Sequence, residues 1–448
     1  MSETTKSKDM KRFILLFVAL ALSTSLLAQE LNNRAEWQFS KNKGYKPAKC
    51  YLETGIYPPK VGIDGAGISF YHNGKVATPA LNDKGYPTAT SACGDYWLFE
   101  VPVKQNVKGL VVDAFLPFTG NEGEQNNFVL EYKDGKRWVE AEKCSSSESY
   151  KHPERLWQSV RIARKCNSVA LRLRQTSRGE VKFSIANPSS QGQHPQIVIY
   201  DNAVPRDTLK VLFLGNSYTY YHTYPVIFKE MAWREGHYAD CDIFISGGYT
   251  MKAHLENEFS ARKVRKGGYD CVMLQDQSVL PLLNGTAYDA GCSRYVGLMV
   301  ENVKKYSPNA KVSLEITWGR RFGNNNLGQY EKYAKLYHEL FASYDAMQDR
   351  LIEKITETAT VNSIQTTPVG VAWQIVMHER PDILLYHKDN HHQSYAGSYL
   401  SAAVAYLTIY GEKFGEDAAN CKLDVATATY LRSVAERVVL DGEKWGKK

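Results

Sequence analysis

The chain lacks the features that define several protein classes. Its formal net charge of +7 is spread over 448 residues and no Lys/Arg tract follows the N-terminus, so composition gives nucleic-acid binding no support. No internal repeat or low-complexity tract occurs. With 43% apolar residues, the chain is not disordered, collagenous or a coiled coil. It is too long for one ordinary hydrophobic core, and we expect two globular domains.

Long hydrophobic runs are also missing, apart from one at Phe13–Ala28. Basic residues precede this run, at Lys6, Lys8, Lys11 and Arg12. The run is short for a membrane span, and Ala28 offers the small residue that signal peptidase needs. We therefore expect a cleaved signal peptide over residues 1–28 and a secreted or periplasmic mature chain without a membrane span. An uncleaved anchor is the alternative.

The chain has no short Cys-x-x-Cys pair, so a zinc site of that type is not supported. Its cysteines fall four in each half: Cys50, Cys93, Cys144, Cys166, Cys241, Cys271, Cys292 and Cys421. Export would permit disulfides, and the sequence does not choose among the possible pairings. Buried free thiols are the alternative in the second half.

Residues 29–205 read as short strands separated by turns. Asp134-Gly135 lies between the apolar run Phe128–Tyr132 and the run Arg137–Glu140, which is a hairpin signal. Val169–Arg174 alternates apolar with charged residues at the period of a strand. The pattern predicts an all-β sandwich of the jelly-roll type.

The pattern changes after a polar joint at Asp201–Asp207. From residue 206 to 448, predicted strands alternate with helices. The strands are Leu209–Leu214, Cys241–Ile245, Cys271–Leu274 and Val312–Ile316, and the longest helical patterns are Ala287–Lys305 and Leu327–Glu357. Such alternation predicts an α/β domain with a parallel sheet and helices on both faces. Ligands bind such sheets at the carboxyl ends of the strands, so the residues just past each strand matter most.

Polar residues and glycine follow the first three of these strands. Ser217 follows the first, Gly248 the second, and Gln275 and Gln277 the third. A C-terminal loop adds Asp389 and His392. The next helix is predicted to begin after Ser394, a plausible N-cap.

These residue types suit nucleophilic catalysis. A serine hydroxyl needs a base to take its proton, and that base needs a carboxylate to orient it and stabilise its charge. Ser217, His392 and Asp389 supply this set. Backbone N–H groups at Ser217 and Gly248, with a side-chain amide of Gln277 or Gln275, would bind the oxyanion of a tetrahedral intermediate.

The order Gly-Asn-Ser, Gly-Gly-Tyr-Thr, a polar block after the third strand and Asp-x-x-His resembles the SGNH (GDSL-type) hydrolase superfamily, over about residues 207–448. It is most similar to a branch with Gly-Asn-Ser in place of Gly-Asp-Ser. The resemblance implies a three-layer α/β/α fold with five parallel strands. It also implies that Ser217 is the nucleophile, His392 the base, Asp389 its partner and Gly248 an oxyanion donor. Gln277 falls where the family has Asn, and Gln275 is close enough to compete.

Other polar and aromatic residues near these motifs have simpler interpretations. His387, His391 and His392 surround Asp389, but neither a His-Glu-x-x-His pattern nor a cysteine set supports a metal site, and we expect no cofactor. His391 is expected to be a bystander and His254 a structural histidine. Trp318 and Arg320, just past the fourth strand, either line the substrate pocket or pack the loop.

The combined reading is an exported serine esterase that removes acetyl or other short acyl groups from a carbohydrate. SGNH-like enzymes joined to β-sandwich modules resemble carbohydrate esterases, so the sandwich is expected to bind or shape a glycan. The alternatives are a lipase or lysophospholipase and a non-catalytic glycan-binding pseudoenzyme. The sequence does not identify the sugar, the ester position, the acyl length or the oligomeric state, nor does it place Trp37, Trp97, Trp138 and Trp157 in a core or on a surface.

Overall fold

The computed structural model describes residues 32–38, 49–52, 67–81, 87–107, 110–121, 123–146, 154–185, 195–200, 206–323 and 330–446. The expected signal peptide, residues 1–28, lies outside these ranges, as does Cys50 in all but its backbone. Within the described ranges, no helix is both long and apolar enough to cross a membrane.

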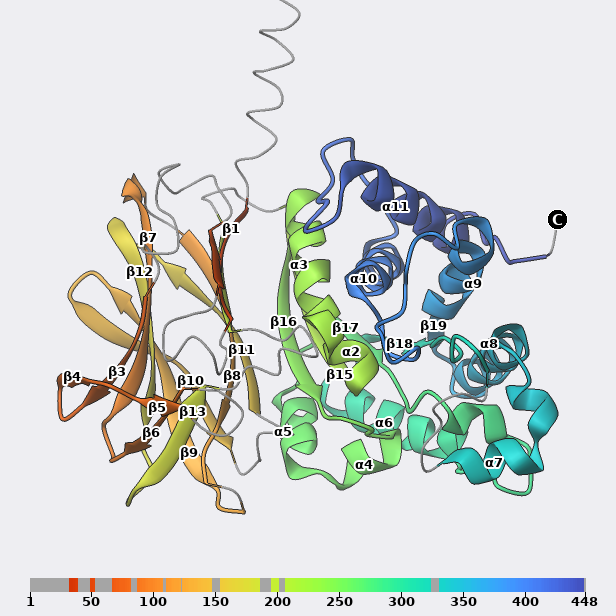
Figure 1. Ribbon diagram of the computed structural model, residues 1–448, viewed down its shortest axis with the longest axis horizontal. Helices are drawn as coiled ribbons and strands as arrows, with labels where there is room; N and C mark the ends of the chain where they lie inside the picture. Colours follow the sequence, from red (N-terminus) through yellow and green to blue (C-terminus); the bar gives the residue numbers. More distant parts are fainter. Residues whose placement is uncertain are drawn as a thin grey trace, which may run out of the picture.

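The described strands up to Tyr200 form two antiparallel sheets that face each other (Figure 1). One sheet contains β2 (Lys49–Leu52), β1 (Asn32–Gln38), β14 (Gln196–Tyr200), β8 (Leu110–Thr119), β13 (Val181–Ile185), β6 (Pro87–Ser91) and β5 (Ala80–Leu81), with β11 (Glu154–Ile162) paired to β8. The other runs in the order β10 (Arg137–Ser146), β9 (Asn126–Asp134), β12 (Cys166–Gln175), β7 (Tyr96–Val107), β3 (Gly67–His72) and β4 (Lys75–Ala77). This is the predicted all-β sandwich.

Alternation of apolar and polar residues places one face of each sheet in the sandwich core. Along β12, Leu171 and Leu173 are buried while Arg172 and Arg174 point outward. Trp97 of β7 is fully buried in the same core. The predicted hairpin also forms, with Asp134 pairing Arg137 across a turn at Gly135, whose φ of 66° is easy for glycine.

The chain from Asp207 onward builds a parallel sheet between two layers of helices. Its strands are β16 (His237–Ile245), β15 (Asp207–Gly215), β17 (Cys271–Leu274), β18 (Lys311–Glu315) and β19 (Gln365–Thr367), in that spatial order. Every pairing in this sheet is parallel. The strand order reverses between β15 and β17, and ligands of such sheets bind outside the carboxyl ends at this point.

Helices cover both faces of the parallel sheet, which gives the expected three layers (Figure 1). One layer holds α3 (Tyr224–Arg234), α9 (Val369–Glu379), α10 (Tyr395–Tyr410) and α11 (Val425–Val439); the other holds α5 (Glu258–Lys266), α6 (Cys292–Tyr306) and α8 (Tyr344–Val361). Shorter helices are α2 (Ser217–Tyr220), η4 (Tyr221–Thr223), α4 (Met251–Glu256), η5 (Leu280–Leu283), α7 (Glu331–Leu336) and η7 (His338–Phe341).

The helical pattern over Leu327–Glu357, described from residue 330 on, does not form one continuous helix. The structure has α7, η7 and α8 in its place. Tyr337 leaves helical geometry after α7, with φ −126° and ψ 54°. Ser343 then caps a new helix, because its side chain accepts a hydrogen bond from the N–H of Ala346.

The sandwich packs directly against the α/β part of the chain. Phe115 of β8 and Trp157 of β11 belong to the same buried cluster as the core of the α/β part. Val111 and Val198 pack with Trp233 of α3. The contact therefore buries apolar surface on both sides.

Cys93, Cys166, Cys241, Cys271 and Cys292 are free thiols. Cys241 and Cys271 lie on β16 and β17, the two strands that flank β15, and both pair with Val211. A whole strand therefore separates them, which is too far for a disulfide. Buried free thiols are the correct interpretation for Cys241, Cys271 and Cys292.

Candidate active site

Ser217 lies where β15 passes into α2, at the reversal point of the sheet. The preceding residue, Asn216, caps α2 by accepting a hydrogen bond from the N–H of Tyr218 at 3.1 Å. Its amide nitrogen donates to the carbonyls of Tyr249 at 2.8 Å and Asp276 at 3.3 Å. These carbonyls follow β16 and β17, so one buried asparagine joins three strand ends around Ser217.

The Ser217 side chain is partly exposed, and its hydroxyl makes no hydrogen bond to a described residue. In particular, it is not bonded to His392 in this structure. Serine–histidine hydrogen bonds of hydrolases are often loose without substrate, so this geometry does not remove Ser217 from consideration as a nucleophile.

Gln275 uses its whole side chain to hold this turn. Its Oε1 accepts from the N–H of Asn216 at 2.9 Å and from the hydroxyl of Thr219 at 3.0 Å, and its Nε2 donates to the carbonyl of Asp276. A side chain at Gly215 would clash with Thr219 and Gln275, so glycine is required there. Both ends of the Gln275 amide thus have structural partners.

Gln277 differs from Gln275 in having a spare donor. Its Oε1 accepts from the N–H groups of Val279 at 2.5 Å and Leu280 at 2.9 Å, which fixes the side chain at the start of η5. Its Nε2 donates to none of the described residues. An amide with a fixed oxygen and an uncommitted NH₂ group suits an oxyanion donor.

Gly248 lies in an exposed turn after β16 in which the N–H of Tyr249 donates to the carbonyl of Ser246 at 3.2 Å. Its φ of 73° is the left-handed value that the third residue of a type II turn requires. No side chain covers its α-carbon, so a ligand has room to approach the backbone.

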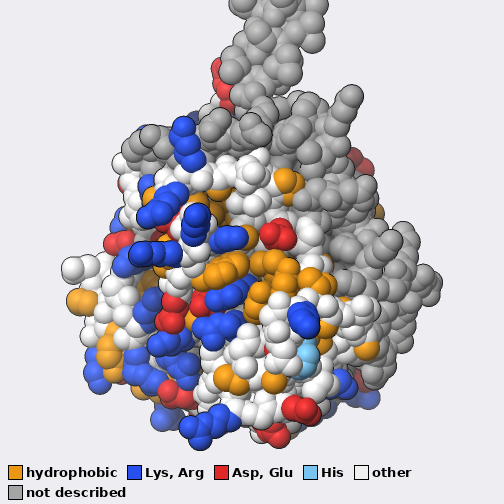
Figure 2. Space-filling model, turned by 90° about the vertical axis from the view of Figure 1, so that its left-hand side faces the viewer, with side chains coloured by type: hydrophobic (Ala, Val, Ile, Leu, Met, Phe, Trp, Pro, Cys, Tyr) orange, Lys and Arg blue, Asp and Glu red, His pale blue; other side chains and the backbone are white. Residues whose placement is uncertain are grey.

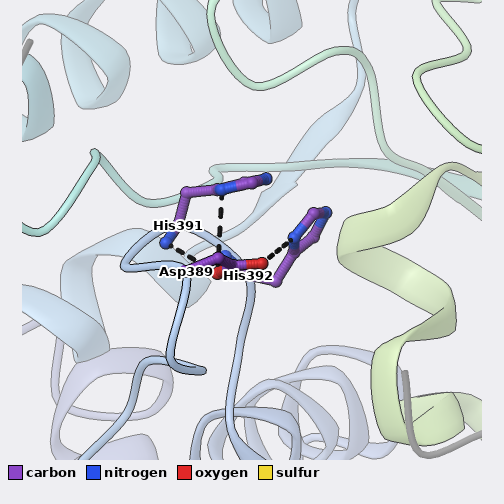
Figure 3. Close-up of side chains that lie close together, drawn as sticks. All are labelled: Asp389, His391 and His392. Carbon is purple, nitrogen blue, oxygen red and sulfur yellow. Dashed lines mark hydrogen bonds and ion pairs between the residues drawn. The ribbon is translucent and has the colours of Figure 1, made fainter. Parts of the chain in front are cut away.

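His392 and Asp389 form a direct pair on one loop (Figure 3). Nδ1 of His392 lies 2.8 Å from Oδ2 of Asp389. Oδ1 of Asp389 accepts from the backbone N–H groups of His391 at 3.1 Å and His392 at 3.0 Å, which curls the loop. A bridge between Tyr386 and Gln393 closes the loop, and α10 follows with Ser394 as its N-cap, as predicted.

The environment sets the charges of this pair. Burial alone would raise the pKa of Asp389, but the hydrogen bond from His392 and the loop N–H groups outweigh it and hold that pKa far below its usual range. Burial lowers the pKa of His392, although the Asp389 carboxylate opposes this effect. Asp389 is therefore ionised and His392 neutral near neutral pH, which is the state a general base needs.

The loop packs against the helix that carries Ser217. The ring of His392 stacks on Tyr221 at 3.9 Å between centroids and meets Tyr218 edge-on at 5.8 Å. Nε2 of Gln393 donates to the carbonyl of Tyr218 at 2.6 Å. Tyr218 and Tyr221 thus contact the loop that carries His392, although about 170 positions separate the two segments in the chain.

Sequence reasoning missed Tyr221 and Gln393 as parts of this arrangement. Tyr221 is four residues after Ser217, and that spacing places two residues on one helical face. Gln393 directly follows the candidate base. These two spacings are the sequence features that could have indicated both residues.

His391 and His254 have different surroundings. Burial lowers the pKa of His391 to about 3, and the charge of Arg320 adds to this effect. His254 is buried, with Nδ1 3.1 Å from the Ser260 hydroxyl and Nε2 3.1 Å from the Gly215 carbonyl. It is a structural histidine, as expected.

Asp389, His391 and His392 place their ligand atoms within 4.8 Å of one another, a spacing that also suits a metal ion. Both carboxylate oxygens, however, already accept hydrogen bonds from the loop. Nδ1 of His392 is engaged with the carboxylate and offers no lone pair outward. This chemistry fits an oriented histidine better than a set of metal ligands.

Trp318 does not line a pocket. It is fully buried, stacked between Tyr218 at 4.3 Å and Trp373 at 4.2 Å, and its Nε1 donates to the carbonyl of His391 at 3.0 Å. Trp318 therefore packs against the loop and does not line the substrate pocket.

No family model matches the chain, and no curated protein matches its sequence. Solved structures are similar at low identity. A DUF4886 family protein from Bacteroides uniformis is 16% identical, with 53% of this chain and 97% of that chain covered and a TM-score of 0.44. A family two carbohydrate esterase from Clostridium thermocellum is 13% identical, with 76% and 98% covered and a TM-score of 0.31. The esterase EstA from Pseudoalteromonas is 13% identical, with 45% and 97% covered and a TM-score of 0.31. Similarity at these scores is too weak to assign a fold or a function.

Proposed function

We propose that the protein is an exported serine esterase of the SGNH type that removes acetyl or other short acyl groups from a carbohydrate. The observation that carries this proposal is the His392–Asp389 pair, whose histidine contacts Tyr218 of α2, the helix that begins with Ser217. A neutral histidine oriented by an ionised carboxylate next to a serine at a strand end is the arrangement that acyl transfer needs.

In this mechanism, Ser217 Oγ attacks the ester carbonyl carbon and its proton moves to Nε2 of His392. The tetrahedral intermediate then collapses, and the C–O bond to the sugar breaks. The sugar oxygen takes the proton from His392. Water repeats these steps on the acyl-enzyme and releases the carboxylic acid and free Ser217.

The oxyanion would be bound by the N–H groups of Ser217 and Gly248 and by Nε2 of Gln277. The spare donor on Gln277 favours it over Gln275, whose amide is fully engaged. Each such donor typically lowers the barrier by about 2.7–4 kcal/mol.

The outward face of the six-stranded sheet is the surface of the sandwich best suited to a glycan (Figure 2). Tyr71 and Tyr96 stack at 4.8 Å, and Arg172 lies over the rings of Tyr96 at 5.0 Å and Trp138 at 4.3 Å. These partly exposed rings come from β3, β7 and β10, with Arg172 of β12 between Tyr96 and Trp138, and Lys and Arg side chains gather around them. Aromatic faces beside polar groups suit sugar rings.

The first test is substrate choice. We expect the purified protein to hydrolyse 4-nitrophenyl acetate much faster than the palmitate and to release acetate from an acetylated polysaccharide. Faster hydrolysis of the palmitate would favour the lipase alternative. Hydrolysis of neither ester would favour the glycan-binding pseudoenzyme.

A further inference from the structure

Arg320 is a buried charge without a counter-ion. The residue is 6% exposed and lies in the segment that follows β18, next to the candidate active site. Among the described residues, no carboxylate forms an ion pair with it, and its Nε is buried without a hydrogen-bond partner. Its one described side-chain acceptor is the hydroxyl of Tyr218, 3.1 Å from Nη1.

A lone buried guanidinium is costly, because its charge leaves water and gains little in return. A hydroxyl oxygen and an aromatic face compensate it only in part, and the Tyr218 ring lies 6.0 Å from the guanidinium carbon. In the part of the chain that the structure describes, the other buried arginine, Arg432, also has no carboxylate partner, but it donates to four acceptors, in Tyr399, Ala419, Asn420 and Thr429. Arg320 has one acceptor among the described residues. Packing alone therefore does not account for Arg320.

The contacts of Arg320 and its neighbour place this charge near the candidate active site. Arg320 binds the side chain of Tyr218, which directly follows Ser217 and is held rigid by its stack on Trp318. The segment that carries Arg320 also contacts the loop, because the N–H of Arg321 donates to the carbonyl of Asn390 at 3.0 Å. Burial lowers the pKa of His391 and of His392, and the charge of Arg320 acts in the same direction. Arg320 is thus linked to the residue after Ser217, and its neighbour Arg321 to the loop that carries His392.

We infer that Arg320 binds an anionic group on the substrate, so that the preferred substrate is an acyl ester of an acidic sugar such as a uronic acid. This inference rests on the proposed esterase function and narrows its substrate class. The flat fork of a guanidinium matches a carboxylate or a phosphate with paired N–H donors. A bound anion would also offset the repulsion between Arg320 and protonated His392 during turnover.

The test compares two acetylated methyl glycosides that differ only at C6, a glucuronoside and a glucoside, with a 6-phosphate as a third arm. We expect wild-type protein to prefer the anionic substrates in kcat/KM by about tenfold to a hundredfold, as for charge-assisted hydrogen bonds. Arg320→Gln should remove this preference, and Arg320→Lys should keep part of it because the charge remains while the fork is lost. The comparison of uronate and phosphate shows which anion fits better.

Arg321→Gln is the matched control, since it removes the neighbouring positive charge while the backbone N–H of residue 321 still bonds Asn390. It should retain the preference. Equal kcat/KM for charged and neutral substrates in wild-type protein would overturn the inference, as would an unchanged preference in Arg320→Gln. If Arg320→Gln does not fold, a preference in Arg320→Lys equal to that of wild type would contradict the inference instead.

Binding separates this inference from the proposed function. Calorimetric titration with unacetylated methyl glucuronoside should show binding to wild-type protein that Arg320→Gln loses. Arg320-dependent binding without hydrolysis of any ester would overturn the esterase proposal and leave the anion site standing. If both esters are hydrolysed at equal rates and the hydrolysis depends on Ser217, the esterase proposal stands and the anion site is overturned.

Discussion

The ammonium group of Lys229 lies 2.8 Å from Oδ1 of Asp113, and both side chains are almost fully buried between the sandwich and α3. Lys229 also donates to the hydroxyl of Ser159 at 2.6 Å. Burial would lower the pKa of Lys229, but the Asp113 charge outweighs it and holds that pKa above its usual value. A charged pair thus crosses the apolar contact between the two parts of the chain.

We expect Asp113→Ala to lower the free energy of unfolding by about 3–5 kcal/mol, because it leaves the Lys229 charge buried and unpaired. Chemical denaturation of the full chain measures this. The double variant Asp113→Leu/Lys229→Met should recover most of the loss, since no charge is left unpaired. A double variant as unstable as Asp113→Ala would show that packing, and not the charge, causes the loss.

The same contact changes how the role of the sandwich is best tested. Deleting residues 29–205 would expose apolar residues of α3 and β16 and leave Lys229 unpaired, so the truncated chain is expected to aggregate. Point changes on the outward face avoid this problem. Tyr96→Ala and Trp138→Ala should each raise KM for an acetylated polysaccharide several-fold and leave hydrolysis of 4-nitrophenyl acetate unchanged, because a remote site touches only the long substrate.

Tyr288→Ala is a suitable control for this experiment, because Tyr288 is an exposed aromatic residue of the α/β part, 46% exposed. It should change neither KM. If the Trp138→Ala variant loses activity equally on the polysaccharide and on 4-nitrophenyl acetate, the outward face has a structural role and does not bind the glycan.

The pH dependence follows from the environment of His392. Activity requires the neutral imidazole, so the rate should rise with pH through the pKa of His392, and burial places this midpoint below the ordinary histidine value of about 6.5. Asp389 stays ionised across this range because its pKa is lowered further. A pH–kcat/KM profile measures the midpoint, and a rate that is flat from about pH 4 to about pH 9 would point to another base.

Gln277 and Gln275 should behave differently when each is changed to Ala. Gln277→Ala removes an Nε2 donor that acts on the oxyanion, so kcat should fall about a hundredfold or more with little change in KM. It also leaves the N–H groups of Val279 and Leu280 without their acceptor, so the free energy of unfolding should fall as well. Gln275→Ala leaves the buried N–H of Asn216 without its acceptor, so the free energy of unfolding should fall by about 1–3 kcal/mol. If only Gln275→Ala lowers kcat, the assignment of the donor is wrong.

Local patterns predicted much of this architecture. Leu209–Leu214 lies within β15, and the Ser394 cap and the helix after it appear as α10, because strand periodicity and capping depend on neighbouring residues. The short polar strand Gln365–Thr367 was missed, since it is a strand only through its pairing with β18. The sequence also does not predict the direction of a side chain. Spacing placed Gln275 and Gln277 near the site, but only their hydrogen bonds show which of them has a free NH₂ group. The Lys229–Asp113 pair joins residues 116 positions apart and leaves no local pattern.

The central claim is tested most directly by hydrolysis of 4-nitrophenyl acetate by Ser217→Ala, His392→Ala and the double variant, each confirmed as folded by circular dichroism. Both single variants should lose on the order of 10⁶-fold in kcat, and the double variant should be little worse, because a nucleophile and its base act as one unit. Asp389→Asn should lose less, about 10⁴-fold, since an amide still orients the ring but does not stabilise its charge. Wild-type turnover by folded Ser217→Ala would contradict the account.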